Sequence, residues 1–403
     1  MSTTLLKSGT LITASETFRA DILIEDEKIR AIGTDLDDPG AQVIEVSGKL
    51  IMPGGIDPHT HFDLPMFNTV SSDDHYTGHK AAAFGGTTTT LDFVPEDYPT
   101  LTEAVEVWHR KADPKAAIDF GFHMNITRLD DKVIGEIPHL VEMGITTLKV
   151  FTAYNGRLRL SAPLYVVHLN TAGGVDQIGY ARERGVKVMG ETCPQYLFFT
   201  EEHLRRPDGA KWICSPPMRT ADDNLSLWQG LAGEIIQTVG TDHCPFFYDG
   251  DRPIVYEGEE IAIPGKELGK NDFTKIPNGL PGVGDRLPVL WTYGVRSGKL
   301  TPNQFVAKTS TNPAKIFGLY PRKGALLPGS DADIVVWDPE RRLTYGLAHA
   351  HHRTDYNLYE NWELVGFPEK VFLRGQLIVD GEKWLGRAGM GQFLHRQTDA
   401  PVL

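Results

Sequence analysis

The 403-residue sequence predicts an α/β protein with a β-rich segment at each end of the chain. Between residues 53 and 323, strand-like runs alternate with helix-like runs, which is typical of parallel strands joined by crossover helices. Several such units in one chain favour a closed barrel over an open, two-sided sheet, although the pattern fits both.

The first 52 residues hold short alternating strands separated by turn residues. The β pattern returns over residues 324–385, where Arg374-Gly375 marks the turn of a hairpin. This later segment forms either a separate β-domain or a single small β-sandwich domain together with residues 1–52. We favour the second arrangement, because neither segment alone has enough strands to bury a face. Residues 386–403 read as a polar C-terminal tail.

The barrel region, residues 53–323, is expected to be catalytic, and its elements follow in order. Strand and helix pairs are expected at 87–93 and 101–112, at 118–126 and 132–143, and at 164–169 and 175–184. Further strands are expected at 146–151, 187–190 and 235–239.

Composition excludes some partners and sites. The net charge is −13, and no stripe of Lys or Arg points to nucleic acid. Cys193, Cys214 and Cys244 are the three cysteines, without a CxxC pair, so a disulfide framework is not expected. Neither a signal peptide nor an apolar run of about 20 residues is visible. We therefore expect a soluble cytoplasmic protein without a membrane partner.

His59 and His61 form the first candidate site. Residues i and i+2 of a strand point to the same side, so the two imidazoles can meet at one point, as a divalent metal ion requires. An isolated HxH tripeptide is more often structural than a ligand pair. The interpretation therefore depends on the rest of the chain.

Four further residues lie where strands of a parallel barrel end, which is where catalytic groups collect. Lys149, inside an apolar strand, must be paired, neutral or modified, unless it reaches solvent at an edge. His168 is either a ligand or a satisfied core group. Asp242 fits a metal ligand, a base or a helix cap. Tyr154 is either an oxyanion donor or a loop tyrosine.

Together with several longer motifs, these residues make the chain resemble the amidohydrolase superfamily. Within it, the chain is most similar to the cyclic amidohydrolase branch of dihydropyrimidinases and hydantoinases. The motifs stand in family order along nearly the whole chain: Pro53–His61, Ala81–Thr89, Lys149–Phe151, Gly190–Tyr196, Cys214–Pro217, Asp272–Gly279 and Gly329–Asp333.

The resemblance implies a (β/α)8 barrel that carries two divalent metal ions, with Zn²⁺ expected. His59, His61 and Asp242 match the ligands of the more buried ion. Lys149 matches a lysine that is carboxylated to an N6-carboxylysine and bridges both ions. His168 matches one histidine of the second ion.

The resemblance also implies the reaction, which is metal-assisted hydrolysis of a cyclic amide to an N-carbamoyl amino acid. Asp242 would act as base and then acid, Tyr154 would donate to the oxyanion, and Ser215 and Asn278 would hold the ring amide. Substrates would be dihydropyrimidines or 5-substituted hydantoins, with an allantoinase-like activity or a non-catalytic relative as alternatives. A homotetramer or homodimer is expected.

One departure from the family pattern concerns the stretch around Leu160-Ser161. Only 18 residues separate Lys149 from His168. A βαβ unit takes about 30 residues, so an intervening strand with its two helices does not fit. We expect a barrel that lacks one helix–strand–helix block and one histidine of the second metal ion. The first site would be complete and the second incomplete, which places activity in question.

Overall fold

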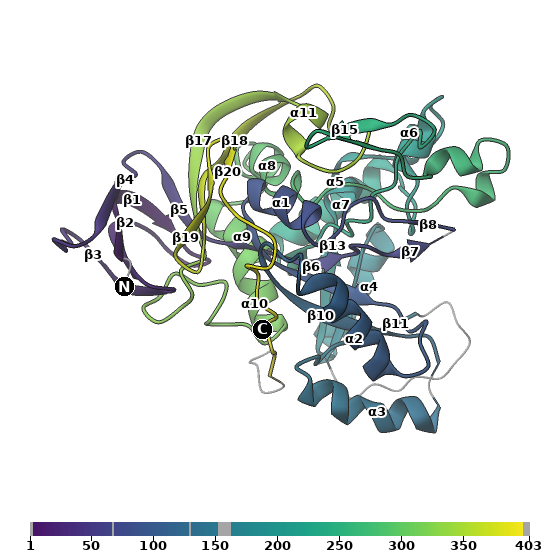
Figure 1. The fold of residues 1–403 in the computed structure, drawn as a ribbon, viewed down its shortest axis with the longest axis horizontal. Helices are drawn as coiled ribbons and strands as arrows, with labels where there is room; N and C mark the ends of the chain where they lie inside the picture. The colour runs from purple at the N-terminus through teal and green to yellow at the C-terminus, as the bar shows by residue number, and fades with distance from the viewer. Residues whose placement is uncertain (1–2, 67, 129, 152–162, 398–403) are drawn as a thin grey trace.

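The computed structural model describes residues 3–66, 68–128, 130–151 and 163–397. A large twisted sheet lies on one side of the molecule, and strands surrounded by helices lie on the other (Figure 1). None of the described helices is long and apolar enough to cross a membrane. The predicted Tyr154 lies outside the described residues.

The large sheet has nine strands, drawn from both ends of the chain. Its order is β20-β19-β18-β17-β5-β1-β2-β3, with β4 paired to β1. The strands are β1 (Thr3–Ile12), β2 (Thr17–Glu25), β3 (Lys28–Gly33), β4 (Gln42–Glu45), β5 (Leu50–Pro53), β17 (Ile334–Tyr345), β18 (Trp362–Leu373), β19 (Gln376–Asp380) and β20 (Lys383–Trp384).

The antiparallel pairing of β5 with β17 joins the two ends of the chain, with Ile51 opposite Val336. Both side chains are buried in one apolar cluster of this sheet. The turn between β18 and β19 is formed by Arg374 and Gly375, both with positive φ, which suits a two-residue hairpin. The boundaries that we gave to the β-domain and the barrel domain stay a prediction.

Among the described residues, seven parallel strands form the barrel region in two sheets. One sheet has the order β11-β10-β9-β6 and the other β12-β13-β14. The strands are β6 (Gly55–Thr60), β9 (Thr87–Val94), β10 (Asp119–Ile126), β11 (Leu148–Val150), β12 (Leu164–Val166), β13 (Val188–Thr192) and β14 (Thr238–Val239). All eight residues of β9 are buried, as expected for a parallel strand covered on both faces.

The two parallel sheets meet at β6. The chain just after β14 pairs with β6, because Thr60 and His243 form a parallel bridge and the His61 N–H donates to the His243 carbonyl at 2.8 Å. On the opposite side, no pairing between described residues joins β11 to β12. We call this break the β11–β12 gap.

The helices pack around these strands. They are α1 (Thr77–Phe84), α2 (Leu101–Ala112), α3 (Asp131–Glu142), α4 (Ala172–Glu183), α5 (Pro194–Phe198), α6 (Glu201–Leu204), α7 (Ala221–Ala232), α8 (Arg286–Leu290), α9 (Pro302–Val306), α10 (Asn312–Ile316) and α11 (Leu347–Ala350). Side chains of Thr100, Asp130 and Thr171 cap α2, α3 and α4. The Thr171 cap explains why α4 begins three residues earlier than predicted.

Short elements complete the chain. Two hairpins are formed by β7 (Pro65–Met66) with β8 (Thr69–Val70) and by β15 (Ile254–Tyr256) with β16 (Glu259–Ile261). Single turns of 3-10 helix occur at η1 (Gly209–Trp212), η2 (Lys266–Gly269) and η3 (Phe273–Lys275), and π-helical turns at η4 (Trp291–Val295) and η5 (Ala307–Thr311).

The C-terminal segment differs from the expected polar tail. Phe393 bridges to Phe120 at the start of β10, and Leu394 is fully buried against the barrel. The Arg396 side chain is buried and donates to the Phe122 carbonyl. The alternation of apolar residues in this short stretch was too brief to predict a strand-like contact.

Candidate metal centre

His59 is the penultimate residue of β6 and His61 directly follows the strand, and both face one carboxylate. The Nε2 atoms of His59 and His61 are 3.1 and 3.2 Å from Oδ1 of Asp242. The candidate ligand atoms of the three residues all lie within 4.8 Å of one another. Two atoms bound tetrahedrally at the usual Zn–N and Zn–O distances lie roughly 3.3 Å apart, so this spacing fits one divalent ion.

The backbone around Asp242 holds its carboxylate in place. Asp242 has a left-handed φ of 55°, and its N–H donates to the His59 carbonyl at 2.9 Å. Thr241 donates its hydroxyl to Asp57 at 2.7 Å, and His243 contacts Asp73 at 3.1 Å. A non-glycine residue in this conformation costs about 1–3 kcal/mol and clusters at functional sites.

Lys149 and His168 complete the group of predicted ligands around His59. Lys149 Nζ lies 3.4 Å from His59 Nε2 and 4.3 Å from the centre of the Phe93 ring. Burial lowers the pKa of Lys149, although the nearby carboxylates of Asp242 and Glu191 favour its charged form. The rings of His59 and His168 are 5.4 Å apart, and His168 also has a positive φ of 40°. The structure thus brings together all five predicted ligands.

Glu191 is the residue that sequence reasoning did not single out. It lies in β13, is fully buried, and contacts His59 Nδ1 through Oε1 at 2.7 Å. It also accepts from the Tyr165 hydroxyl at 2.8 Å and from the His168 N–H at 3.3 Å. A carboxylate on the outer nitrogen of a ligating histidine fixes which nitrogen faces the metal.

The charges of the centre favour a bound cation. Burial opposes protonation of His59, but Glu191 and Asp242 raise its pKa to about 9. Burial lowers the pKa of His61 to about 4 and that of His168 to about 4. Although burial opposes its charge, the two imidazoles hold the pKa of Asp242 well below its usual range. Asp242 as a carboxylate and His61 and His168 as neutral imidazoles are in the forms that bind a metal ion, whereas His59 must release a proton when the ion binds.

A buried atom of the centre also has no protein partner. His61 Nδ1 is inaccessible to solvent and makes no hydrogen bond within the described part of the chain. By contrast, both nitrogens of His123 are occupied, by Thr147 at 2.5 Å and by the Pro58 carbonyl at 3.1 Å. His123 therefore belongs to the packing of the barrel and is not available to replace the missing histidine of the second metal ion.

Ser215 and Asn278 lie on two loops that contact each other. Ser215 is exposed and precedes a cis peptide bond to Pro216, and Asn278 is half-buried. Lys266, which is fully buried, donates to the Ile213 carbonyl at 3.1 Å and to the Pro277 carbonyl at 3.2 Å. Burial lowers its pKa to about 7. Lys266 therefore joins the two loops, which the sequence did not reveal.

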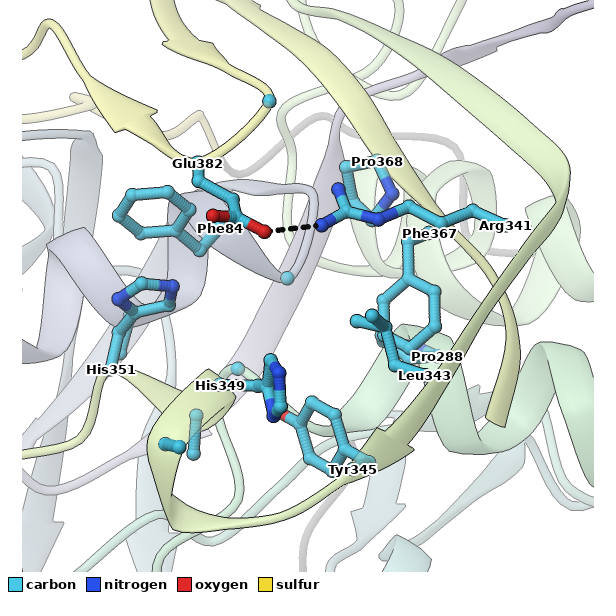
Figure 2. Close-up of a pocket in the computed structure, with 16 residues that line it drawn as sticks. Phe84, Pro288, Arg341, Leu343, Tyr345, His349, His351, Phe367, Pro368 and Glu382 are labelled. Atoms are coloured by element: carbon cyan, nitrogen blue, oxygen red, sulfur yellow. Dashed lines mark hydrogen bonds and ion pairs between the residues drawn. The ribbon is translucent and has the colours of Figure 1, made fainter. Parts of the chain in front are cut away.

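A separate pocket of about 290 Å³ lies between the end of α1, α8 and the strands β17 and β18, and it shares no residue with the metal centre. Figure 2 shows Arg341 and Glu382 paired on one side of it. Their closest nitrogen and oxygen atoms are 3.0 Å apart. Phe84 and His351 stack with ring centres 3.6 Å apart. Nothing in this lining resembles the ligand set around His59.

Parallel strands with histidines and a carboxylate at the strand ends are the arrangement expected of a metal-dependent hydrolase of the amidohydrolase type. Residues 160–378 match the Amidohydrolase family. The chain is 38% identical to the D-hydantoinase of Geobacillus stearothermophilus, with 98% of this chain and 96% of the relative covered. The chain therefore belongs to the amidohydrolase family, and its relatives are hydantoinases and dihydropyrimidinases.

Further relatives support the same family assignment. The D-hydantoinase of Streptomyces coelicolor is 35% identical, with 98% of each chain covered. The solved structure of the dihydropyrimidinase of Brevibacillus agri is 39% identical in sequence and has a TM-score of 0.92. The match covers 99% of this chain and 100% of that chain. The L-hydantoinase of Arthrobacter aurescens, at 24% identity and a TM-score of 0.84, shares the fold.

Proposed function

We propose that this protein hydrolyses the cyclic amide bond of dihydropyrimidines or 5-substituted hydantoins to give N-carbamoyl amino acids. The observation that carries the proposal is the meeting of His59, His61 and Asp242 within 4.8 Å, in a chain 38% identical to a D-hydantoinase. We propose His59, His61 and Asp242 as holders of one divalent ion, with Zn²⁺ expected from the nitrogen and oxygen ligands.

A divalent ion there would lower the pKa of a water molecule and polarise the ring carbonyl. Asp242 then accepts a proton from the attacking water and later returns one to the ring nitrogen. The new bond joins the water oxygen to the carbonyl carbon, and the bond from that carbon to the ring nitrogen breaks. Tyr154 is proposed as the oxyanion donor, and Ser215 and Asn278 as the residues that orient the ring amide.

We further propose that the second metal position is incomplete. It would be formed by Lys149, carboxylated on Nζ, and His168. Two findings support a missing block in the barrel. The alignment with the Geobacillus relative spans 468 positions, whereas this chain has 403 residues, so at least 65 positions face gaps. In addition, the strands flanking the β11–β12 gap expose Leu148 and Leu164, at 39% and 41%, where a parallel barrel normally covers apolar side chains.

The β11–β12 gap also favours a second candidate, a non-catalytic relative that keeps the first metal position without turnover. An allantoinase-like specificity is a further alternative within the same reaction class. Assembly into a homotetramer or homodimer and a cytoplasmic location stay predictions.

The test measures metal content and ring opening on the same purified protein. We expect zinc bound at about one ion per chain, and product formation from a 5-substituted hydantoin or dihydrouracil, followed by chromatography. Asp242→Asn should lower kcat/KM by about 10²–10⁴-fold, since it removes the base. Asp222→Asn, at an exposed position on α7, is the matched control.

Three outcomes would contradict the proposal. Without bound metal, the ligand assignment fails. With metal bound but no ring opening, the non-catalytic relative is favoured. Activity unchanged in Asp242→Asn would refute the role of this carboxylate. Intact-mass measurement with and without bicarbonate tests the carboxylation of Lys149, which adds the mass of one CO₂ to the chain.

A further inference from the structure

The buried carboxylate of Glu191 contacts two of the proposed metal ligands from behind. Its Oε1 lies 2.7 Å from His59 Nδ1 and 3.3 Å from the backbone nitrogen of His168. Its Oε2 accepts from the Tyr165 hydroxyl at 2.8 Å. One carboxylate in β13 thus connects the end of β6 with the end of β12.

The direction of these bonds sets the orientation of His59. A carboxylate oxygen only accepts, so the 2.7 Å contact requires a proton on Nδ1 of His59. Nε2 is then the nitrogen left to face Asp242, at 3.1 Å, and Lys149, at 3.4 Å. The imidazole has one nitrogen assigned to Glu191 and the other to the metal position.

The same carboxylate holds a strand that has only one neighbour. β12 pairs with β13 and, within the described residues, with no other strand. It is three residues long, whereas β9 and β10 have eight residues each. Short strands with one partner open easily, because the backbone N–H and C=O groups on their unpaired side have no partner on a neighbouring strand. The bonds from Glu191 to Tyr165 and His168 supply part of the missing restraint.

We propose that Glu191 is a positioning residue that fixes His59 with Nε2 toward the metal and ties the edge strand β12 to the same centre. This inference rests on the proposed function only through the metal position, and it does not require turnover. It predicts that Glu191 controls metal affinity and the order of β12 together.

The first experiment compares Glu191→Gln with Tyr165→Phe in the full-length protein. Tyr165→Phe is the matched control, because it removes one donor to Glu191 but leaves the contact with His59. We expect Glu191→Gln to weaken Zn²⁺ binding about 10–100-fold in competition with a chromophoric chelator, and Tyr165→Phe to change it less than about threefold. The Co²⁺ absorption spectrum should change in Glu191→Gln alone.

Hydrogen exchange tests the second part of the proposal, which is that Glu191 restrains β12. Peptides that cover residues 163–169 should exchange faster in Glu191→Gln, and to a smaller extent in Tyr165→Phe. Equal metal affinity and an unchanged Co²⁺ spectrum in Glu191→Gln would overturn the positioning of His59. Unchanged exchange in this peptide would overturn the restraint on β12.

A measurement on the unmutated protein covers the case in which Glu191→Gln does not fold. With ¹⁵N-labelled histidine and Zn²⁺ bound, His59 should carry its proton on Nδ1, with the assignment taken from the signal lost in His59→Gln. A proton on Nε2 would refute the proposal. None of these readouts uses substrate, so the absence of hydrolysis would count against the proposed function alone.

Discussion

Removal of the Lys323 ammonium tests how much the buried ion pairs between the large sheet and the barrel contribute to stability. Lys323 is 1% exposed, and its Nζ lies 2.5 Å from Asp119, 2.7 Å from Asp333 and 3.0 Å from Asp331. Asp119 begins β10 of the barrel, whereas Asp331 and Asp333 lead into β17 of the sheet. Arg374, at the β18–β19 turn, also pairs with Asp119.

The magnitude follows from burial. Lys323→Met keeps most of the apolar length of the side chain and leaves three buried carboxylates facing fewer cations. Removing one partner of a buried ion pair costs about 3–5 kcal/mol. Lys28 contacts the same Asp331 at 2.5 Å, but its side chain is 48% exposed. Lys28→Met is therefore the matched control, and an exposed partner of this kind contributes about 0–1 kcal/mol.

The assay is urea denaturation followed by circular dichroism at several pH values. Burial opposes the charge of Asp331, but Lys323 and Lys28 lower its pKa to about 2. Because this pKa is lower in the folded than in the unfolded state, the stabilisation is present above about pH 4 and is lost as the pH falls toward 2. The deficit of Lys323→Met should therefore be largest near neutral pH and shrink in acid. A deficit within 1 kcal/mol of that of Lys28→Met, or one equal at pH 3 and pH 7, would refute this reasoning.

Two further predictions concern the metal centre and the loops beside it. Zn²⁺ at 100 times its Kd should raise the free energy of unfolding by about 2.7 kcal/mol over the chelated protein, measured by urea denaturation, and equal values would argue against a metal bound to the folded state. Lys266→Met should raise KM for the hydantoin, because the loops at Ile213 and Pro277 lose their shared donor. An unchanged KM in a variant with a native circular dichroism spectrum would show that Lys266 does not organise these loops.

The parts predicted from the sequence were those governed by local rules. The alternation of residues along a strand placed His59 and His61 on one side of β6, and the structure brings them to one carboxylate. The pair Arg374-Gly375 favoured a two-residue hairpin turn, which the structure contains. The α2 helix has the predicted bounds, because its apolar period and its capping threonine agree.

The parts that were not predicted depend on contacts between distant segments. Glu191 lies 132 positions from His59 in the chain, so no local pattern reveals their contact. Lys266 is buried against carbonyl groups of two loops. A lysine in a polar stretch of sequence gives no sign of such burial. Similarly, Leu394 and Arg396 are buried because β10 offers them a surface, not because the tail is apolar.

The position of the β11–β12 gap explains why one metal site can survive where the other is incomplete. His59, His61 and Asp242 lie where β6 and the chain after β14 pair, and β6 pairs with β9 on its other side. Lys149 and His168 are on or just beyond the two three-residue strands that flank the gap. Ligands on strands with two partners keep their positions, whereas those at frayed edges must be restrained by side chains. We therefore expect the first metal site to tolerate the shortened barrel and His168 to depend on Glu191.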